Sequence, residues 1–335
     1  MKLKRAVYLV YYLKQLDREK FNLFLNYTSE LTGKPKIAIL SDIVKSVFIY
    51  NISILEYFQF YFYKLSKQER ASWAGTGHMY EYQLVMNPKN NREILENKAL
   101  FYRYYKDFIV HKVADIEDLK KKPAVADAIL SNASGKLVFK SADGNCGAEV
   151  EIRNCKDFGW QSVIEYMEDS VYEVIEEFIE QHRELNRLSP SAVNTVRICT
   201  QLNEEGETDI LGCRLRISVN SPVDNMAAGN LAAPIDEGTG QLSGPAVYSD
   251  ITKPEQEYHP VTRVKIPGFQ IPFWEETINM VKKAAKMHPQ NKSIGWDIVI
   301  TEKGPGLIEG NHDWCKLLWQ LPVKKGLKSA LQDVI

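Results

Sequence analysis

The order of elements along the chain predicts an α+β fold. Apolar, β-branched runs at 193–202 and 209–219 alternate with polar residues as antiparallel strands do, and 294–300 with 306–311 form a further strand pair. A helical pattern ended by proline covers 273–289. Strands and helices therefore come in blocks, not as regular strand–helix–strand units, which favours α+β architecture. The length of 335 residues suits two or three lobes.

Composition narrows the class of protein. Charged residues are 25% of the chain and the formal net charge is -1, so no global basic footprint for nucleic acid is present. Five cysteines occur without any CxxC or Cys/His metal spacing, which indicates reduced thiols and a cytoplasmic protein. The N-terminus lacks a small-residue cleavage site after its short apolar run, and we read it as a structured start.

The most apolar stretch, 46–65, predicts a buried amphipathic helix. Asn51, Ser53, Glu56 and Gln59 interrupt it, which argues against a membrane span. Docking to a membrane-bound partner is the alternative interpretation.

We expect three parts along the chain. Residues 1–92 form a mostly helical, aromatic-rich region, and the polar, turn-rich stretch at 75–93 marks its end. Residues 93–175 form a small lobe, and residues 176–335 form a large lobe. Within the small lobe, 136–142 and 148–154 predict a β-hairpin around a glycine-bearing loop.

The strand pair near the C-terminus carries unusual polar residues. Asp297 lies in the first apolar strand, Glu309 and Asn311 lie in the second, and a Lys-Gly-Pro-Gly turn joins them. Side chains alternate between the faces of a strand, so Glu309 and Asn311 share a face. An odd-length loop would place Asp297 opposite one of them, and a loop one residue longer or shorter would put it on the other face.

Two carboxylates facing each other on a sheet repel, and burial strengthens the effect. A cation between them would remove the repulsion, and oxygen ligands of which two are anionic suit Mg²⁺ better than Zn²⁺. The alternative is a hairpin whose acids simply face water. The strands are otherwise strongly apolar, which favours the metal site.

Upstream residues have the chemistry to hold phosphates. Lys140 ends an apolar strand, and Gly144 and Gly147 in the following loop let backbone amides approach an anion closely. Lys98 opens a helix about forty residues earlier; taken alone, it would be an ordinary surface lysine. The strand at 171–179 runs into acids and Phe178, where backbone groups could contact an adenine edge.

The combined order of these features resembles the ATP-grasp enzymes, among them D-alanine–D-alanine ligase and glutathione synthetase. More narrowly, four stretches are similar to the sugar-transfer-associated ATP-grasp family, which is linked to surface-polysaccharide loci. They are SPSAVNTVRICT (189–200), RLRIS (214–218), VDNMAAGN (223–230) and SIGWDIVITEKGPGLIEGN (293–311). The resemblance covers most of the chain and implies an ATP-grasp fold, in which two α+β lobes hold ATP between them.

The resemblance also implies roles for individual residues. Lys98 and Lys140 would hold the α and β phosphates, residues 141–147 would fold over them, Glu176 would accept from the adenine amino group, and Glu184 with His182 would contact the ribose. Asp297, Glu309 and Asn311 would hold one or two Mg²⁺ ions, for which Mn²⁺ could substitute. The residues assigned to ATP are Lys98, Lys140, Ser141, Asp143, Gly144, Asn145, Gly147, Glu176, Glu177, Phe178, Ile179, His182 and Glu184.

One position departs from the family pattern. Many ATP-grasp ligases carry an arginine two residues before the first metal-binding acid, and here that position is Gly295. The positive charge would then come from Arg197, Arg214 or Arg216, of which the last two share one face of a strand. Asn194 and Asn225 are further candidates near the substrate.

The resulting hypothesis is an ADP-forming carboxylate–amine ligase that works through an acyl phosphate. Its substrates would be a small-molecule acid and an amine, either of them sugar-linked, as in surface-polysaccharide or sugar-acid conjugate synthesis. A peripheral association with polysaccharide-assembly proteins is a further expectation, and the oligomeric state stays open. The alternatives are a phosphotransferase on the same scaffold and a nucleotide-binding partner of a glycosyltransferase.

Overall fold

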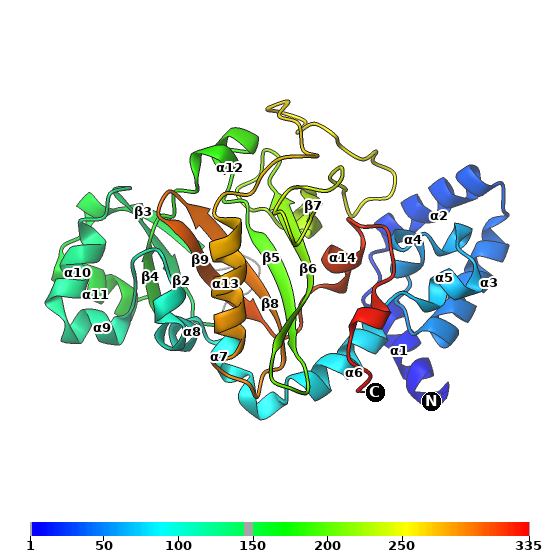
Figure 1. The fold of residues 1–335 in the computed structure, drawn as a ribbon, viewed down its shortest axis with the longest axis horizontal. Coiled ribbons are helices and arrows are strands. Elements are labelled where there is room, and N and C mark those ends of the chain that lie inside the picture. The colour runs from blue at the N-terminus through cyan, green and yellow to red at the C-terminus, as the bar shows by residue number, and fades with distance from the viewer. Residues whose placement is uncertain (1, 144–149, 335) are drawn as a thin grey trace.

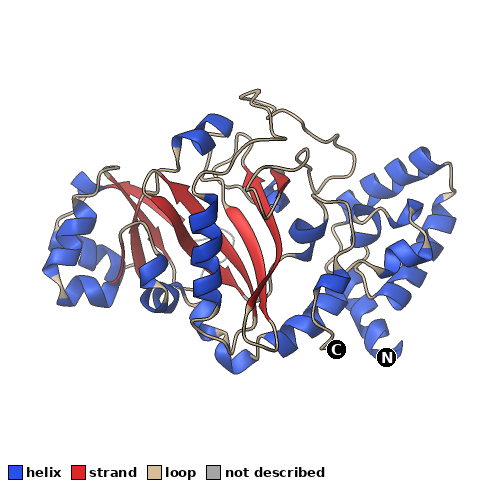
Figure 2. Cartoon of the chain, viewed as in Figure 1, coloured by secondary structure: helices blue, strands red, loops and turns tan. Residues whose placement is uncertain are grey.

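The computed structural model describes residues 2–143 and 150–334. The molecule is elongated, with a small sheet at one end, a large sheet in the middle and the N-terminal helices at the other end (Figure 1). Figure 2 shows two sheets with helices beside them and a helical N-terminal region, and all strand pairs are antiparallel, so the predicted α+β class is confirmed. The described part of the chain contains no helix long and apolar enough to cross a membrane.

The N-terminal region is helical and rich in aromatic side chains, as predicted. Phe24, Tyr57, Phe58, Phe60 and Phe62 are fully buried in one cluster. The elements are α1 Lys2–Lys14, α2 Arg18–Thr32, α3 Lys36–Tyr50, α4 Glu56–Gln59, η1 Phe62–Lys64, α5 Lys67–Ala71 and α6 Thr76–Met86.

Two expectations for this region are wrong. The stretch 46–65 is mostly buried but is not one helix, because α3 ends at Tyr50 and the next residue, Asn51, has a left-handed backbone (φ 57°). Gly75 and Gly77 pack so closely on Asn51 that a Cβ at Gly77 would lie 2.1 Å from the Asn51 Oδ1 atom. The stretch 75–93 is not turn-rich, because most of it forms α6.

The small sheet has four antiparallel strands in the order β1-β4-β2-β3. The expected hairpin is confirmed, since β2 pairs with β3 from Lys136 opposite Asn154 to Lys140 opposite Val150. Leu119, Ile129 and Val163 from the flanking helices pack on the sheet. The elements of this part are η2 Lys89–Asn91, α7 Glu93–Glu96, α8 Lys98–Tyr104, η3 Lys106–Phe108, β1 Val113–Asp115, α9 Ile116–Lys121, α10 Pro123–Leu130, β2 Lys136–Lys140, β3 Val150–Asn154, η4 Cys155–Asp157, α11 Trp160–Glu168 and β4 Val174–Glu177.

The large sheet has five antiparallel strands in the order β7-β6-β5-β8-β9, so all its neighbouring strands run in opposite directions. One face packs on α13, which crosses it in Figure 1, and α14 lies beside the N-terminal helices. The side chain of Gln320 in α14 accepts a hydrogen bond from the Ala74 amide and donates one to the Ala74 carbonyl. These two bonds attach α14 to the N-terminal helical region. The elements are α12 Arg183–Leu188, β5 Val196–Leu202, β6 Thr208–Ile217, η5 Met226–Ala228, β7 Leu231–Ile235, α13 Trp274–Ala285, β8 Ser293–Thr301, β9 Gly304–Asn311, α14 Lys316–Gln320 and η6 Lys328–Ala330.

The division at residues 92 and 175 stays a prediction. The second of these positions falls inside β4, whose residues 174–177 belong wholly to the small sheet.

Candidate active site

The β8–β9 hairpin brings its two acids opposite each other. The turn is Glu302–Lys303, because Thr301 pairs with Gly304. This is a two-residue turn, so the odd-length loop is wrong, and turn length alone would set Asp297 against Ile308. A β-bulge between Asp297 and Ile298 shifts the register and leaves Ile308 unpaired, so that Asp297 faces Glu309. The expected juxtaposition is therefore confirmed, but the bulge creates it.

Asp297 is buried and neutralised by two arginines. Its side chain is 2% exposed, and its Oδ1 and Oδ2 atoms accept hydrogen bonds from Arg197 Nε at 2.5 Å and Nη2 at 2.8 Å. Arg216 Nη1 lies 3.3 Å from Oδ2. Burial opposes ionisation, but the two guanidinium groups outweigh it and hold the pKa of Asp297 well below its usual range. Asp297 is thus an anion throughout the physiological pH range.

The pKa of Glu309 is shifted in the opposite direction. Burial and the adjacent Asp297 carboxylate raise the pKa of Glu309, and Arg197 only partly offsets this. Its Oε1 atom accepts one hydrogen bond, from Asn311 Nδ2 at 3.2 Å. Asn311 Nδ2 also donates to the Gly295 carbonyl at 3.2 Å. Both contacts use the amide nitrogen, so neither of them occupies the Asn311 Oδ1 atom. A cation next to Glu309 would therefore be favourable.

This donor set fits Mg²⁺ bound together with phosphates. Within residues 2–143 and 150–334, no group of three His, Cys, Asp or Glu side chains could hold a metal by itself. Two carboxylates and an amide oxygen are nevertheless hard oxygen ligands, and Mg²⁺ sites often use one or two carboxylates and take the remaining ligands from water and substrate phosphates. The metal assignment of Asp297, Glu309 and Asn311 stays a prediction.

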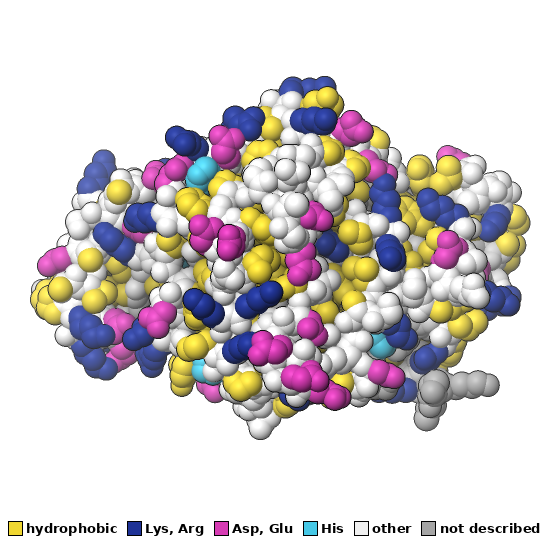
Figure 3. Space-filling view, viewed as in Figure 1, with side chains coloured by type: hydrophobic (Ala, Val, Ile, Leu, Met, Phe, Trp, Pro, Cys, Tyr) yellow, Lys and Arg dark blue, Asp and Glu magenta, His cyan; other side chains and the backbone are white. Residues whose placement is uncertain are grey.

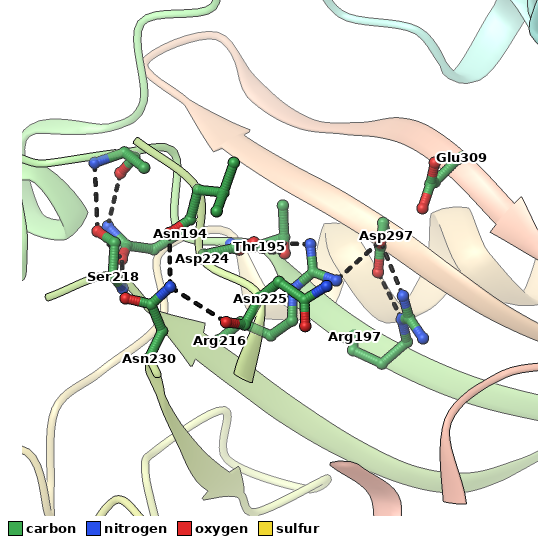
Figure 4. Close-up of polar contacts among 12 residues, drawn as sticks. Asn194, Thr195, Arg197, Arg216, Ser218, Asp224, Asn225, Asn230, Asp297 and Glu309 are labelled. Atoms are coloured by element: carbon green, nitrogen blue, oxygen red, sulfur yellow. Dashed lines mark hydrogen bonds and ion pairs between the residues drawn. The ribbon is translucent and has the colours of Figure 1, made fainter. Parts of the chain in front are cut away.

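Arg216 links Asp297 to a second buried acid. Its Nη2 atom is 2.8 Å from Asp224 Oδ1, while the other Asp224 oxygen accepts from the Thr195 hydroxyl at 2.5 Å and the Thr195 amide at 2.8 Å. The Arg216 Nε atom is buried and has no hydrogen-bond partner in the described chain. Figure 4 shows Arg216 between Asp224 and Asp297, with Arg197 on the far side of Asp297. The inner strands β5 and β6 thus carry two fixed arginines, and Arg216 has one unused donor among the described residues.

The local packing explains why residue 295 is a glycine. A Cβ there would lie 2.4 Å from the Trp314 Cβ and 3.4 Å from Arg197 Cδ. The space beside the backbone of Gly295 is therefore filled by Trp314, and Arg197 from the neighbouring strand supplies positive charge directly opposite Asp297.

The other three substrate-side candidates have different surroundings. Arg214 shares the predicted face, but its guanidinium donates to the Trp319 carbonyl of α14 (Nε at 2.9 Å) and to the Cys213 carbonyl, away from Asp297. Asn194 is fully buried and bonds Gln181, Ser189 and Ser218, which is a structural role. Asn225 lies beside Arg216 and caps η5 through the Ala227 amide.

Two cavities meet at the hairpin. The first, of about 430 Å³, is lined by the arginine pair, Asp224, Asn225 and an apolar wall that includes Met226 and Leu318. The second, of about 610 Å³, is lined by Lys98, Phe101 and Asp143. Both volumes are in the range of small-molecule sites. The residues that line both cavities are Ile308, Glu309, Asn311 and Asp313.

Lys98 and the start of the glycine loop are tied together. The Lys98 amide donates to the Ala142 carbonyl at 3.0 Å, and Asn97 Nδ2 is 3.5 Å from Asp143 Oδ1. Burial lowers the pKa of Lys98, and Lys140 lowers it further, while Glu309 acts in the opposite sense. An anion bound here would relieve the repulsion between the two lysines. Ser141 follows directly after β2 and is partly buried.

Lys140 is held by Glu176. Its Nζ is 2.7 Å from Glu176 Oε2, and Glu176 also accepts from the Tyr102 hydroxyl at 2.5 Å, with His111 Nε2 at 3.4 Å. Glu176 is 1% exposed; burial opposes its ionisation, but Lys140 and His111 hold its pKa well below the usual range. The side chain predicted to contact adenine thus lies beneath Lys140.

The remaining nucleotide candidates are spread along the chain from the end of β4 onward. Glu177, Phe178 and Ile179 line a third cavity, of about 540 Å³. His182 caps α12 by accepting from the Glu184 amide at 3.1 Å, and Glu184 is paired with Arg187. Neither of these two side chains lines one of the three cavities. Gly144, Asn145 and Gly147 lie outside the described residues.

Sequence reasoning missed several residues around the first cavity. Asp224 and Thr195 fix Arg216, and both lie in stretches that carry the family resemblance, next to residues that were singled out. Lys20 of α2 and Gln59 of α4 line the cavity from the N-terminal helices. Nothing in their local sequence indicates this, because it depends on long-range packing: Gln59 Nε2 donates to the Ser249 carbonyl at 3.1 Å, and Leu317 of α14 packs on the N-terminal core.

Comparison with known proteins identifies a family. The family described as sugar-transfer associated ATP-grasp matches residues 78–335. None of the curated proteins matches the chain.

Similar solved structures are distant in sequence. The ATP-grasp ligase PsnB, complexed with a precursor variant, Mg and ADP, is 11% identical with a TM-score of 0.42, and the match covers 79% of this chain and 69% of that one. D-alanyl-alanine synthetase A from Vibrio cholerae is 11% identical with a TM-score of 0.37 and coverages of 69% and 60%. The biotin carboxylase domain of Hydrogenobacter thermophilus 2-oxoglutarate carboxylase, solved with MgADP, ADP and bicarbonate, is 15% identical with a TM-score of 0.38 and coverages of 69% and 46%. The chain thus spans about half the length of the last of these.

Proposed function

Because the chain belongs to the sugar-transfer-associated ATP-grasp family, we propose that it is an ATP- and Mg²⁺-dependent ligase that joins a carboxylic acid to an amine. The observation that carries this proposal is the position of Glu309 and Asn311, which line two adjoining cavities at once. Lys98 lies in one cavity, and Arg197 and Arg216 lie in the other. A reaction that moves a phosphoryl group from a nucleotide to a second substrate needs two adjoining binding sites, with charged groups where they meet.

In the first step an oxygen of the substrate carboxylate attacks the γ-phosphorus, the bond to the β–γ bridging oxygen breaks, and ADP leaves. The products of this step are ADP and an acyl phosphate. Lys98 and Lys140 would neutralise the phosphates, and the unpartnered Arg216 Nε would donate to the transferred group. Mg²⁺, held by Asp297, Glu309 and Asn311, would neutralise phosphate charge when bound.

In the second step the amine attacks the acyl carbon, inorganic phosphate leaves, and the amine nitrogen loses a proton. No protein nucleophile is required. Burial fixes Arg197 and Arg216 before substrate arrives, so they pay little reorganisation when charge develops on the acyl phosphate.

For the substrates we propose a sugar acid such as a uronate, or an amino acid joined to an amino sugar, in surface-polysaccharide or conjugate synthesis. The family's association with sugar transfer supports this class. The cytoplasmic location and an association with polysaccharide-assembly proteins remain predictions.

The test is a coupled ADP-release screen over uronic acids, amino acids and amines, with mass detection of the products. A ligase releases ADP and phosphate only when acid and amine are both present, and it yields their amide. Release of ADP with one hydroxylated compound, and a product heavier by one phosphoryl group, would identify a phosphotransferase instead. Stable nucleotide binding without turnover over the whole panel would favour a non-catalytic partner of a glycosyltransferase.

A further inference from the structure

The N-terminal helices expose an unusual number of apolar side chains. Of the 21 large apolar side chains that are exposed in the described chain, nine lie in α1, α2 and α3, within the first 50 of 335 residues. They are Val7, Val10, Tyr11, Leu13, Leu23, Leu31, Ile37, Val44 and Ile49. Single exposed apolar residues need no explanation, but such a concentration does.

On α1 these residues form a continuous stripe. Val7, Val10, Tyr11 and Lys14 are spaced three and four residues apart, so they share one face of the helix. Val7 is 62% exposed, Val10 54% and Tyr11 57%. We call this set the α1 stripe.

The opposite face of α1 packs against the rest of the protein. The Tyr8 hydroxyl contacts Glu81, and Tyr12 is buried in the N-terminal core. Arg5 donates to the carbonyls of Phe48 and Ile49 at the end of α3. These inner contacts fix α1 against the rest of the protein. The α1 stripe is therefore exposed on a helix that is firmly packed.

The net charge of the N-terminal helices indicates which kind of surface the α1 stripe would bind. The first 50 residues contain nine basic and four acidic residues, a net charge of +5, although the whole chain has a net charge of -1. Lys14 ends the stripe, and α1 itself contains no acid. Yellow and dark-blue patches interleave over the N-terminal helices, at the right in Figure 3.

We propose that α1, with α2 and α3 beside it, docks peripherally on an anionic membrane surface. Apolar side chains on one helix face, with lysine and arginine around them, bind the boundary between lipid headgroups and acyl chains. A second copy of the chain fits less well, because it would bring two surfaces of charge +5 together. The proposal does not depend on the proposed chemistry.

The N-terminal helical region also contributes to the wall of the first cavity. Lys20 of α2 and Gln59 of α4, both in the N-terminal helical region, line the cavity that holds Arg216.

Vesicle flotation of the full chain tests the proposal. We expect binding to vesicles of phosphatidylcholine mixed with phosphatidylglycerol, and weak binding to phosphatidylcholine alone. Raising the salt concentration should weaken the binding, because exposed charges are screened. Equal binding to both vesicle types, or none to either, would overturn the proposal.

Matched variants locate the surface. Val7→Asp and Lys14→Glu should each lower the vesicle partition coefficient about tenfold or more. Val171→Asp and Lys156→Glu are the controls, at equally exposed positions in the small-sheet part (Val171 is 60% exposed), and they should bind as the wild type does. If the controls lose binding as strongly as the α1 variants, or if sedimentation shows a dimer that only Val7→Asp dissociates and no vesicle binding occurs, the proposal fails.

Discussion

Two buried carboxylates, Asp297 in the large sheet and Glu176 in the small sheet, are each neutralised by cations of a different kind. Asp297 is held by two arginines, of which Arg197 is bidentate. Glu176 is held by one lysine, with a tyrosine hydroxyl and a histidine beside it. A planar guanidinium is fixed by its paired hydrogen bonds, whereas an ammonium on a flexible stem can change partners.

This difference assigns different roles to the two clusters. The arginine cluster is organised before any substrate arrives, because Arg216 is also fixed by Asp224. If Lys140 binds a phosphate as proposed, it would leave Glu176, and Tyr102 and His111 would remain beside the carboxylate. In the proposed reaction the large sheet would thus provide a rigid electrostatic frame, and the small sheet would provide a cation that moves.

Asp297→Asn should have the largest effect. Any neutral residue at position 297 leaves Arg197 and Arg216 without their common anion. We expect ADP release to fall to background, and the free energy of unfolding to fall by about 3 kcal/mol or more. Urea unfolding and the coupled assay measure the two quantities; near wild-type turnover at limiting Mg²⁺ would exclude Asp297 from the metal site.

Glu309→Gln should separate catalysis from folding. Turnover should fall at least about 100-fold, as for loss of a group that stabilises transition-state charge. Stability should be kept, because the raised pKa of Glu309 means that its ionised form costs folding free energy.

The pH dependence gives the sign of that effect. A raised pKa in the folded state contributes stability at low pH, and the wild type loses this contribution as the pH rises through the folded pKa. Glu309→Gln should therefore gain on the wild type in metal-free buffer as pH rises from about 4. A variant that loses stability over this interval would contradict the assignment.

Arg216→Lys should reduce turnover more than nucleotide affinity. A lysine keeps the charge but loses the Nε donor and the paired contacts to Asp224 and Asp297, and we expect a loss of about 10- to 100-fold in kcat. Arg214→Lys is the matched control on the same strand: it should lower the melting temperature and leave kcat nearly unchanged, because Arg214 bonds the Trp319 carbonyl. Equal losses of kcat in both variants would remove the special role of Arg216.

Lys140→Ala should weaken ATP binding about tenfold, the value of one charge-assisted contact. It should also leave Glu176 without its main cation, so the pKa of Glu176 should rise toward its usual range or above. Wild-type Glu176 contributes stability above its unfolded pKa, which is lost as pH falls through the depressed folded pKa. Calorimetric titration with ATP checks the first effect, and unchanged affinity would exclude Lys140 from the nucleotide site.

Gly295→Ala should have the smallest effect on activity in the series. The new Cβ would meet Trp314, and we expect a loss of about 1–3 kcal/mol in the free energy of unfolding. Gly238→Ala is the control, since its Cβ would meet nothing closer than 3.6 Å. If both variants unfold alike, close packing of Trp314 does not explain the glycine.

The sequence predicted the strands of the site better than the strand register and the side-chain contacts between them. Alternating apolar residues predicted both hairpins and the α+β class, because those patterns follow from local burial. The β-bulge at Ile308 could not be predicted, since register depends on the pairing of β9 with β8 and not on the turn alone. The carboxylate beneath Lys140 was also beyond sequence reasoning, because only the register of β2 against β4 brings Glu176 there.

The most direct test of the account is the linkage between Mg²⁺ and nucleotide at the β8–β9 hairpin. Binding of a non-hydrolysable ATP analogue is measured by calorimetry with Mg²⁺ and with a chelator, for the wild type and for Glu309→Gln. The account predicts that Mg²⁺ tightens binding to the wild type and that most of this gain disappears in the variant. The same Mg²⁺-dependent gain in both proteins would show that the hairpin does not hold the metal.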